Sequence, residues 1–231
     1  MQPYTFQVFG IDHIFSIIAI ILVFIALLRF NKDLGIKDNS RSFLLVLAFI
    51  MISLDLSEDL VRVFTGFYSI RKDLPLQLCS IGVYLASYTL LNRKQIFFDM
   101  IFYWGFVGAS NAILTPDGDL FELRVFFFYS QAYHAALIFA VLWLMIKYDM
   151  RMRYNSILKV VMSTNIVIGL LSILNYVLDS NYMFLRQIPN SVSPFLMGEW
   201  PIYILMVQVF SIILVVLFIR IQDFFMKPIK Y

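Results

Sequence analysis

The chain has a single cysteine, Cys79, and only two histidines, His13 and His134, among its 231 residues. One cysteine excludes an internal disulfide framework and argues against a structural zinc site, which needs several thiolate or imidazole ligands. The sequence also lacks a nucleotide-binding glycine loop, an HExxH metal motif and a GxSxG nucleophile elbow. We therefore expect no metal, no cofactor and no ATP-driven or kinase-like chemistry.

Charged residues are also scarce, at 14% of the chain, whereas 61% of the residues are apolar and 17% are aromatic. This composition is too apolar for an ordinary soluble domain and indicates an integral membrane protein. The net charge is +3, but the basic residues stand in short loops between apolar runs. That placement is typical of topology control and argues against a nucleic-acid partner.

Seven apolar segments are long enough to cross a bilayer, which takes about 17 to 25 residues each. We place them at residues 13–30, 43–66, 74–91, 95–115, 123–146, 157–178 and 200–220. The first run has no basic residue before it and no small-residue cleavage site after it, which favours a retained span over a signal peptide. No internal repeat and no long linker is visible. The sequence therefore predicts an all-α, polytopic membrane helical bundle that forms one domain over residues 1–231.

The lysine and arginine residues fall unequally on the two sides of such a bundle. If the N-terminus lies outside, 13 of the 18 are cytoplasmic and five are external. The cytoplasmic set is Arg29, Lys32, Lys37, Arg41, Arg93, Lys94, Lys147, Arg151, Arg153, Lys159, Arg220, Lys227 and Lys230, and the external set is Arg62, Arg71, Lys72, Arg124 and Arg186. This positive-inside bias predicts an external N-terminus, a cytoplasmic C-terminus and a location in the cell membrane.

Four ionisable residues share one face of the second span. Asp55, Glu58, Asp59 and Arg62 are spaced by three, four and seven positions, which places them within a sector of roughly 80° on a helix. Each such group costs about 2.5 to 3.5 kcal/mol in a span, so this face should point into the bundle or a wet cavity. Two interpretations remain open: an internal ion-pair network around Arg62, or a coordinating or proton-handling site with surplus acid.

Cys79 lies four residues after Pro75, in the stretch that we predict to begin the third span. Because a proline is tolerated in the first turn of a helix, we expect the helix to begin near Leu74 and to hold Cys79 about one turn inside. The stated orientation then puts the thiol in the outer half of the membrane. A lone cysteine in an apolar helix is usually a small hydrophobic residue. It becomes a nucleophile only beside a group such as histidine.

His134 on the fifth span is the histidine that could meet this thiol, with Ser130 one turn before it on the same face. The other histidine, His13, lies at the outer end of the first span. A catalytic histidine needs a third group to orient its ring, and Asn111, Asp117 or an acid of the second span would serve. A buried histidine is, however, more often a satisfied packing residue, so both interpretations stay open.

The longest connection, residues 179–199, lies on the outer side and contains Asn181 before an aromatic pair; Trp200 follows it. Tyrosine and tryptophan residues at the end of a membrane span usually anchor a protein at the membrane interface. The alternative interpretation is a lid or re-entrant segment over an outward-facing pocket.

Several short motifs, in the same order along the chain, give a family resemblance. They are Phe6-Gln7-Val8-Phe9 with His13, Leu74-Pro75-Leu76-Gln77-Leu78-Cys79-Ser80-Ile81, Leu114-Thr115-Pro116-Asp117, Tyr129 to His134, Asn181-Tyr182-Met183-Phe184 and Trp200-Pro201-Ile202-Tyr203. With these motifs the chain resembles the YwaF-type bacterial integral membrane proteins, a group that extends to transmembrane protein 164 of animals.

The resemblance implies a polytopic helical bundle and a thiol-dependent acyltransferase that moves a fatty acyl chain between phospholipids. It implies Cys79 as the acyl acceptor and His134 as the general base, with membrane lipids as donor and acceptor. One position departs from the family pattern, because Gln77 stands where a histidine is usual, and glutamine cannot take a proton near neutral pH. The alternative function is a membrane binding or transport protein with an outward-open polar cavity.

Overall fold

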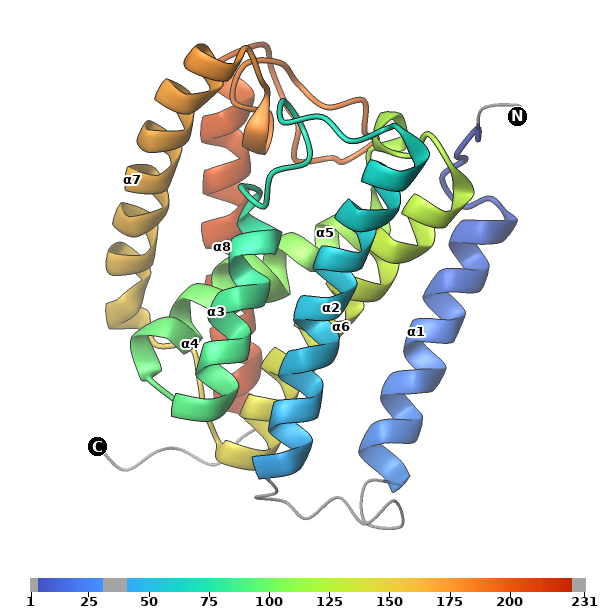
Figure 1. Cartoon of the computed structure of the whole chain (residues 1–231). Coiled ribbons are helices and arrows are strands. Elements are labelled where there is room, and N and C mark those ends of the chain that lie inside the picture. The colour runs from blue at the N-terminus through green and yellow to red at the C-terminus, as the bar shows by residue number, and fades with distance from the viewer. Residues whose placement is uncertain (1–3, 31–40, 226–231) are drawn as a thin grey trace.

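The computed structural model describes residues 4–30 and 41–225, and within these ranges all regular structure is helical. The elements are α1 (Ile11–Phe30), α2 (Arg41–Thr65), α3 (Leu78–Asn92), α4 (Gln95–Ile101), η1 (Phe102–Gly108), α5 (Ala109–Leu114), η2 (Gly118–Leu120), α6 (Arg124–Tyr148), α7 (Tyr154–Leu178), η3 (Tyr182–Phe184) and α8 (Ile202–Phe225). Because α4, the π-helix η1 and α5 follow one another without a break, the longer helices form seven segments. The predicted all-α helical bundle is confirmed (Figure 1).

Five of the seven segments are long and apolar enough to cross a membrane. They are α1, the continuous stretch from α4 to α5, α6, α7 and α8. The other two are α2, which carries the ionisable face, and α3, which is only 15 residues long. The protein is therefore a multi-pass membrane protein.

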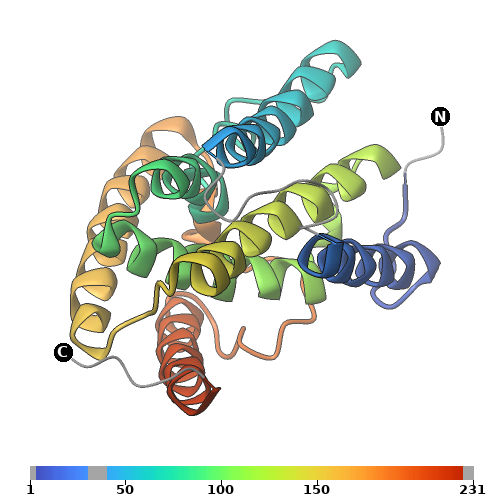
Figure 2. The same ribbon diagram turned by 90° about the horizontal axis from the view of Figure 1, so that it is seen from below.

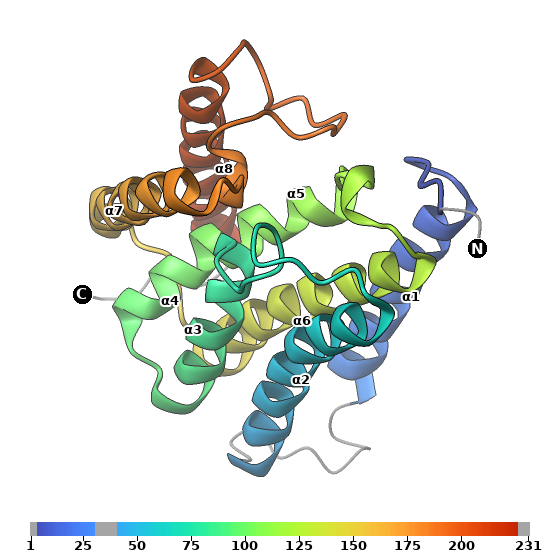
Figure 3. The ribbon, with the colours of Figure 1, turned by 45° about the horizontal axis from the view of Figure 1, so that its top comes forward.

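Helix α6 lies at the centre of the bundle, between α2 and the stretch from η1 to α5, whereas α1 stands at the edge (Figures 2 and 3). Leu137, in the middle of α6, is fully buried. A Cβ atom on Gly105 of η1 would lie 3.0 Å from Leu137 Cγ, so only glycine permits this close approach of the two helices. A π-helical turn widens the helix locally and rotates the residues that follow it, and such turns are frequent at functional sites.

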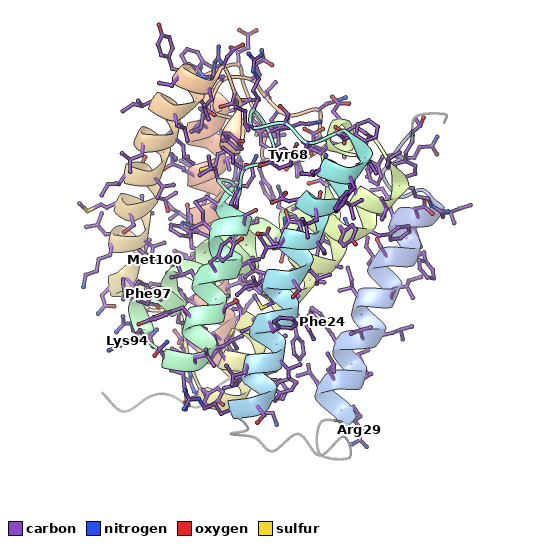
Figure 4. All side chains as sticks on the ribbon, in the orientation of Figure 1. Phe24, Arg29, Tyr68, Lys94, Phe97 and Met100 are labelled. Atoms are coloured by element: carbon purple, nitrogen blue, oxygen red, sulfur yellow. The ribbon has the colours of Figure 1, made fainter. Side chains whose placement is uncertain are left out.

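Successive long segments run in opposite directions, so α1 begins and α8 ends at opposite ends of the bundle (Figure 1). Arg29 and Lys94 lie at one end, and Tyr68 lies toward the other (Figure 4). This arrangement agrees with an odd number of crossings. Four members of the predicted cytoplasmic set, Lys32, Lys37, Lys227 and Lys230, lie outside the described residues.

The predicted start of the third helix is wrong by four residues. Helix α3 begins at Leu78, with Gln77 as its extended N-cap residue, so Cys79 is the second residue of the helix and not one turn inside. The segment 66–77 instead descends as a loop, and α3 begins well below the top of α2 (Figure 1). The prediction relied on the local tolerance of Pro75, whereas long-range contacts described below hold this segment as a loop.

Two members of the ionisable face of α2, Glu58 and Arg62, belong to an ion-pair network. Arg62 is only 5% exposed. Its guanidinium lies 3.0 Å from Glu58, 2.9 Å from Glu122 and 3.6 Å from Asp73, and it also donates to the carbonyl oxygen of Leu120. The network joins α2 to the loop that leads to Cys79 and to the loop that leads to α6. Asp55 and Asp59 form no ion pair among the described residues, so the ion-pair interpretation covers only half of the face.

His13 is a satisfied structural histidine. Its side chain is 0% exposed, its Nδ1 accepts from the backbone N–H of Phe9 at 2.9 Å, and its Nε2 donates to the carbonyl oxygen of Ile113 at 2.7 Å. One ring nitrogen accepts and the other donates, which fixes a neutral tautomer. His13 thus ties the start of α1 to the end of α5.

Candidate functional site

A cavity of about 340 Å³ lies between α3, the stretch from η1 to α5, α6, α7, α8 and the loop 179–201. This volume lies within the usual range of small-molecule sites. Much of its lining is apolar, and no lysine or arginine contributes to it; the apolar residues include Leu78, Ala112, Leu120, Phe121, Ile168, Leu196, Ile204 and Val207. Such a lining suits a long apolar group that carries few polar atoms.

Cys79 and His134 both line this cavity, although they come from different helices. The sulfur of Cys79 packs beside Gly108, because a Cβ atom on that glycine would lie 3.8 Å from Sγ. The missing side chain at Gly108 leaves space next to the thiol on the cavity side. The sequence paired Cys79 with His134 through a chemical argument and through the family resemblance, and in the structure both residues line the same cavity.

The ring of His134 is oriented by its own helix. Its Nδ1 lies 2.7 Å from the carbonyl oxygen of Ser130 and 3.4 Å from the Ser130 hydroxyl. Because a carbonyl oxygen only accepts, Nδ1 carries the proton and Nε2 is the nitrogen with a free lone pair. Within the described chain, Nε2 makes no hydrogen bond. His134 therefore has one nitrogen free to take a proton, and Ser130 is the orienting group that the sequence assigned elsewhere.

Gln77 lines the cavity at the end where the loops 66–77 and 179–201 meet, and its side chain links these two loops. Its Oε1 accepts from the backbone N–H of Met183 at 2.8 Å. Met183 and Phe184 adopt positive φ angles of 55° and 53°, a region that costs free energy for residues other than glycine. Further bonds hold this turn, including one from the Tyr203 hydroxyl to the Phe184 carbonyl oxygen. The loop thus covers the cavity, as the lid interpretation expects.

Asn111 and Asp117 also line the cavity, at the end of α5 and just beyond it. Asp117 caps the short turn η2, where its Oδ1 accepts from the backbone N–H of Asp119 at 3.0 Å. Burial raises the pKa of the Asp117 carboxyl above its ordinary value, and the Asp119 N–H limits the rise. Neither side chain is hydrogen-bonded to His134 in the described chain.

Six other residues singled out from the sequence lie outside the cavity lining: His13, Asp55, Glu58, Asp59, Asn181 and Trp200. Asp55 accepts from the Tyr84 hydroxyl at 2.9 Å, and Glu58 pairs with Arg62. Asn181 bonds within its own loop to Arg186 and Gln187. Trp200 is 61% exposed and donates to the Leu185 carbonyl oxygen, which agrees with an interfacial anchor. No cluster of three metal-ligating side chains occurs among the described residues.

A comparison with models of known protein families shows the family of the chain. Residues 8–219 match the TMEM164 family, which is nearly the whole length of the protein. The chain belongs to the TMEM164 family. Comparisons with curated proteins and with solved structures give no match.

In this TMEM164-family chain, Tyr182 supports the site from outside the cavity lining, a role that the sequence did not single out. Tyr182 is 0% exposed, and its hydroxyl donates to the Ile70 carbonyl oxygen at 2.6 Å and accepts from the Leu74 N–H at 3.0 Å. Asn175, at the end of α7, holds the Tyr182 backbone through both its N–H and its carbonyl oxygen. These bonds fix the loop that precedes Cys79. The only sequence signal was the position of Tyr182 inside a motif shared with relatives.

Tyr182→Phe is expected to destabilise this family member by about 1 to 3 kcal/mol, because it leaves the Leu74 N–H and the Ile70 carbonyl without their buried partner. The midpoint of thermal unfolding in detergent measures the effect. Tyr176→Phe is the matched control, since Tyr176 is 83% exposed on α7. Equal midpoints for the two variants would show that Tyr182 does not hold the loop.

Proposed function

We propose that the protein is a thiol-dependent phospholipid acyltransferase in which Cys79 carries the acyl chain and His134 moves the proton. The observation that carries the proposal is the presence of both side chains at one largely apolar cavity of a membrane protein. The apolar lining suits a fatty acyl chain, and the resemblance described above points to the same chemistry. From the motifs quoted above, we infer that the chain belongs to the YwaF-type bacterial members of the family.

The first half-reaction transfers the acyl group to the protein. The Cys79 thiol gives its proton to Nε2 of His134 as the sulfur attacks the ester carbonyl carbon of a phospholipid. The ester C–O bond then breaks, and the departing lysophospholipid oxygen takes the proton back from His134. The products are a thioester on Cys79 and a lysophospholipid.

The second half-reaction reverses these roles. The hydroxyl of an acceptor lysophospholipid gives its proton to His134 and attacks the thioester carbonyl carbon. The C–S bond breaks, and the sulfur recovers the proton. Because one ester is exchanged for another, the cycle needs no oxidant, no reductant and no cofactor.

We further infer that α2 and α3 complete seven spans, with the N-terminus outside and the C-terminus in the cytoplasm. The unequal distribution of the 18 basic residues supports this orientation. The end of the bundle that holds the loops 66–77 and 179–201 then faces the outside, so the cavity serves lipids of the outer leaflet.

The proposal is tested by acyl exchange in vesicles. The purified protein is mixed with a phospholipid that carries a deuterated acyl chain and with an unlabelled lysophospholipid, and mass spectrometry follows the new diacyl lipid. Transfer by the parent protein is expected, and His134→Gln should slow it about 10²- to 10⁴-fold because the general base is lost. His13→Gln is the matched control, since His13 lies outside the cavity and should leave the rate per folded molecule unchanged. Absence of transfer by the parent would reject the proposal.

The alternative of a transport or binding protein rested on the acids of the second span and on the long loop 179–199. Asp55, Glu58 and Asp59 are not among the residues that line the cavity, and Glu58 is engaged by Arg62. The loop does line the cavity, but a loop in that place suits an acyl-transfer site equally well, so it does not favour the second function.

A further inference from the structure

Asn111 lines the cavity, and its side-chain oxygen is hydrogen-bonded. Its Oδ1 accepts from the Ser193 hydroxyl at 3.0 Å. The single proton of the Thr115 hydroxyl is shared between Oδ1, at 3.2 Å, and the backbone carbonyl oxygen of Asn111, at 3.0 Å. Thr115 belongs to the next turn of the same chain segment, whereas Ser193 comes from the loop that covers the cavity. The side chain is therefore held in one orientation from two directions.

The other end of the same amide is free. Within the described residues, Nδ2 of Asn111 makes no hydrogen bond, although a primary amide offers two N–H donors. Asn111 is half-buried and lines the cavity. A pair of oriented donors thus faces a space whose lining contains no lysine or arginine. A negative charge that develops there is stabilised by neutral donors and by His134 once it has taken the proton of the thiol.

The position of Asn111 along its helix places these donors near the thiol. Gly108, whose added Cβ would lie 3.8 Å from the Cys79 sulfur, precedes Asn111 by three residues. Residues three apart on a helix are neighbours on one face, with their Cβ atoms about 5 to 6 Å apart. Asn111 therefore lies one turn further along the chain than the residue that packs beside the sulfur, and Asn111 and Cys79 line the same cavity.

We propose that Asn111 donates its Nδ2 hydrogen bonds to the acyl carbonyl oxygen, and so stabilises the oxyanion that forms when Cys79 attacks the ester. This inference rests on the acyl-transfer function proposed above. Thr115 and Ser193 act as positioning residues, because they hold the amide with its nitrogen toward the substrate. Oriented donors of this kind act where charge develops, so they accelerate the reaction more than they strengthen substrate binding.

The test compares Asn111→Asp with the parent in the vesicle exchange assay. Aspartate keeps the shape and the accepting oxygen but removes both donors, so the rate of Cys79 acylation should fall about 10²- to 10³-fold. The apparent affinity for lipid should change little. Asn92→Asp is the matched control, since Asn92 lies at the opposite end of α3, outside the cavity. Ser193→Ala, which removes one of the two positioning bonds, should give a smaller, about tenfold, loss.

A spectroscopic measurement separates substrate contact from a structural role. With a ¹³C-labelled acyl carbonyl, the thioester on Cys79 should show a lower carbonyl stretching frequency in the parent than in Ser193→Ala or Asn111→Asp, since a hydrogen bond weakens the C=O bond. Equal frequencies and equal acylation rates in these proteins would overturn the role of Asn111 while leaving acyl transfer intact. A parent protein that never acquires an acyl group would overturn both.

Discussion

Cys79→Ser is expected to reduce acyl transfer to the uncatalysed level, a loss of about 10³-fold or more, without changing the fold. A hydroxyl is a far weaker nucleophile than a thiol at neutral pH unless a strong base activates it. The exchange of sulfur for oxygen is small, and the side chain packs beside Gly108, where space is left. The rate of exchange in vesicles measures the loss, and the thermal unfolding midpoint confirms that the bundle is intact.

The matched control for this variant is Ser87→Ala on the same helix. Ser87 is buried away from the cavity lining, and its hydroxyl donates to the Val83 carbonyl oxygen at 2.8 Å within α3. Its loss should leave the rate of transfer near that of the parent. A Cys79→Ser protein that exchanges acyl chains as fast as the parent would contradict the role of the thiol.

Arg62→Met is expected to cause the largest loss of stability, about 3 to 5 kcal/mol. The substitution leaves the carboxylates of Glu58, Glu122 and Asp73 without the buried cation that they surround. Removing one partner of a buried ion pair costs this much because an uncompensated charge remains in a poorly solvated site. The unfolding midpoint in detergent and the yield of folded protein measure the effect.

Arg71→Met provides the control for the ionic contribution. The pair between Arg71 and Asp179 is 3.3 Å long, but its two side chains are 63% and 65% exposed. Such a pair contributes only about 0 to 1 kcal/mol, so the variant should unfold near the temperature of the parent. Arg62→Met with Glu58→Gln should recover part of the lost stability, because one of the uncompensated charges is then removed. Equal stability of Arg62→Met and Arg71→Met would show that the network does not hold the loops.

The seven helical segments could be predicted from the apolar runs, because a helix in a membrane satisfies its own backbone and depends little on distant contacts. Their bounds agree with the sequence to within three residues, except at the start of α3, which comes four residues later than predicted, and at the end of α8, which comes five residues later. Before α3, the segment 66–77 is held as a loop by the Tyr182 hydroxyl, which bonds to Ile70 and Leu74 from more than 100 positions away. Local propensity at Pro75 could not reveal that contact.

The two residues proposed to react could be picked out from the sequence, whereas the residues around them could not. Cys79 and His134 are rare residue types in an apolar chain, and the family resemblance implied the same pair. The orienting contact of Ser130, the close approach of Gly108 and the hydroxyl bonds to Asn111 depend on how α5, α6 and the loop 179–201 meet. His13 and the acids of α2 share the rarity of the reactive residues, yet packing assigns them to structure.

The central claim is that Cys79 carries the acyl chain as a thioester, and intact mass spectrometry tests it most directly. The parent protein is incubated with a phospholipid of one defined acyl composition in the absence of an acceptor, and its mass is recorded before and after treatment with hydroxylamine. We expect a population heavier by that acyl group, located on the peptide that contains Cys79, removed by hydroxylamine and absent from Cys79→Ser. A parent protein that exchanges acyl chains while its mass stays unchanged, or an acyl group found on another residue, would contradict the account.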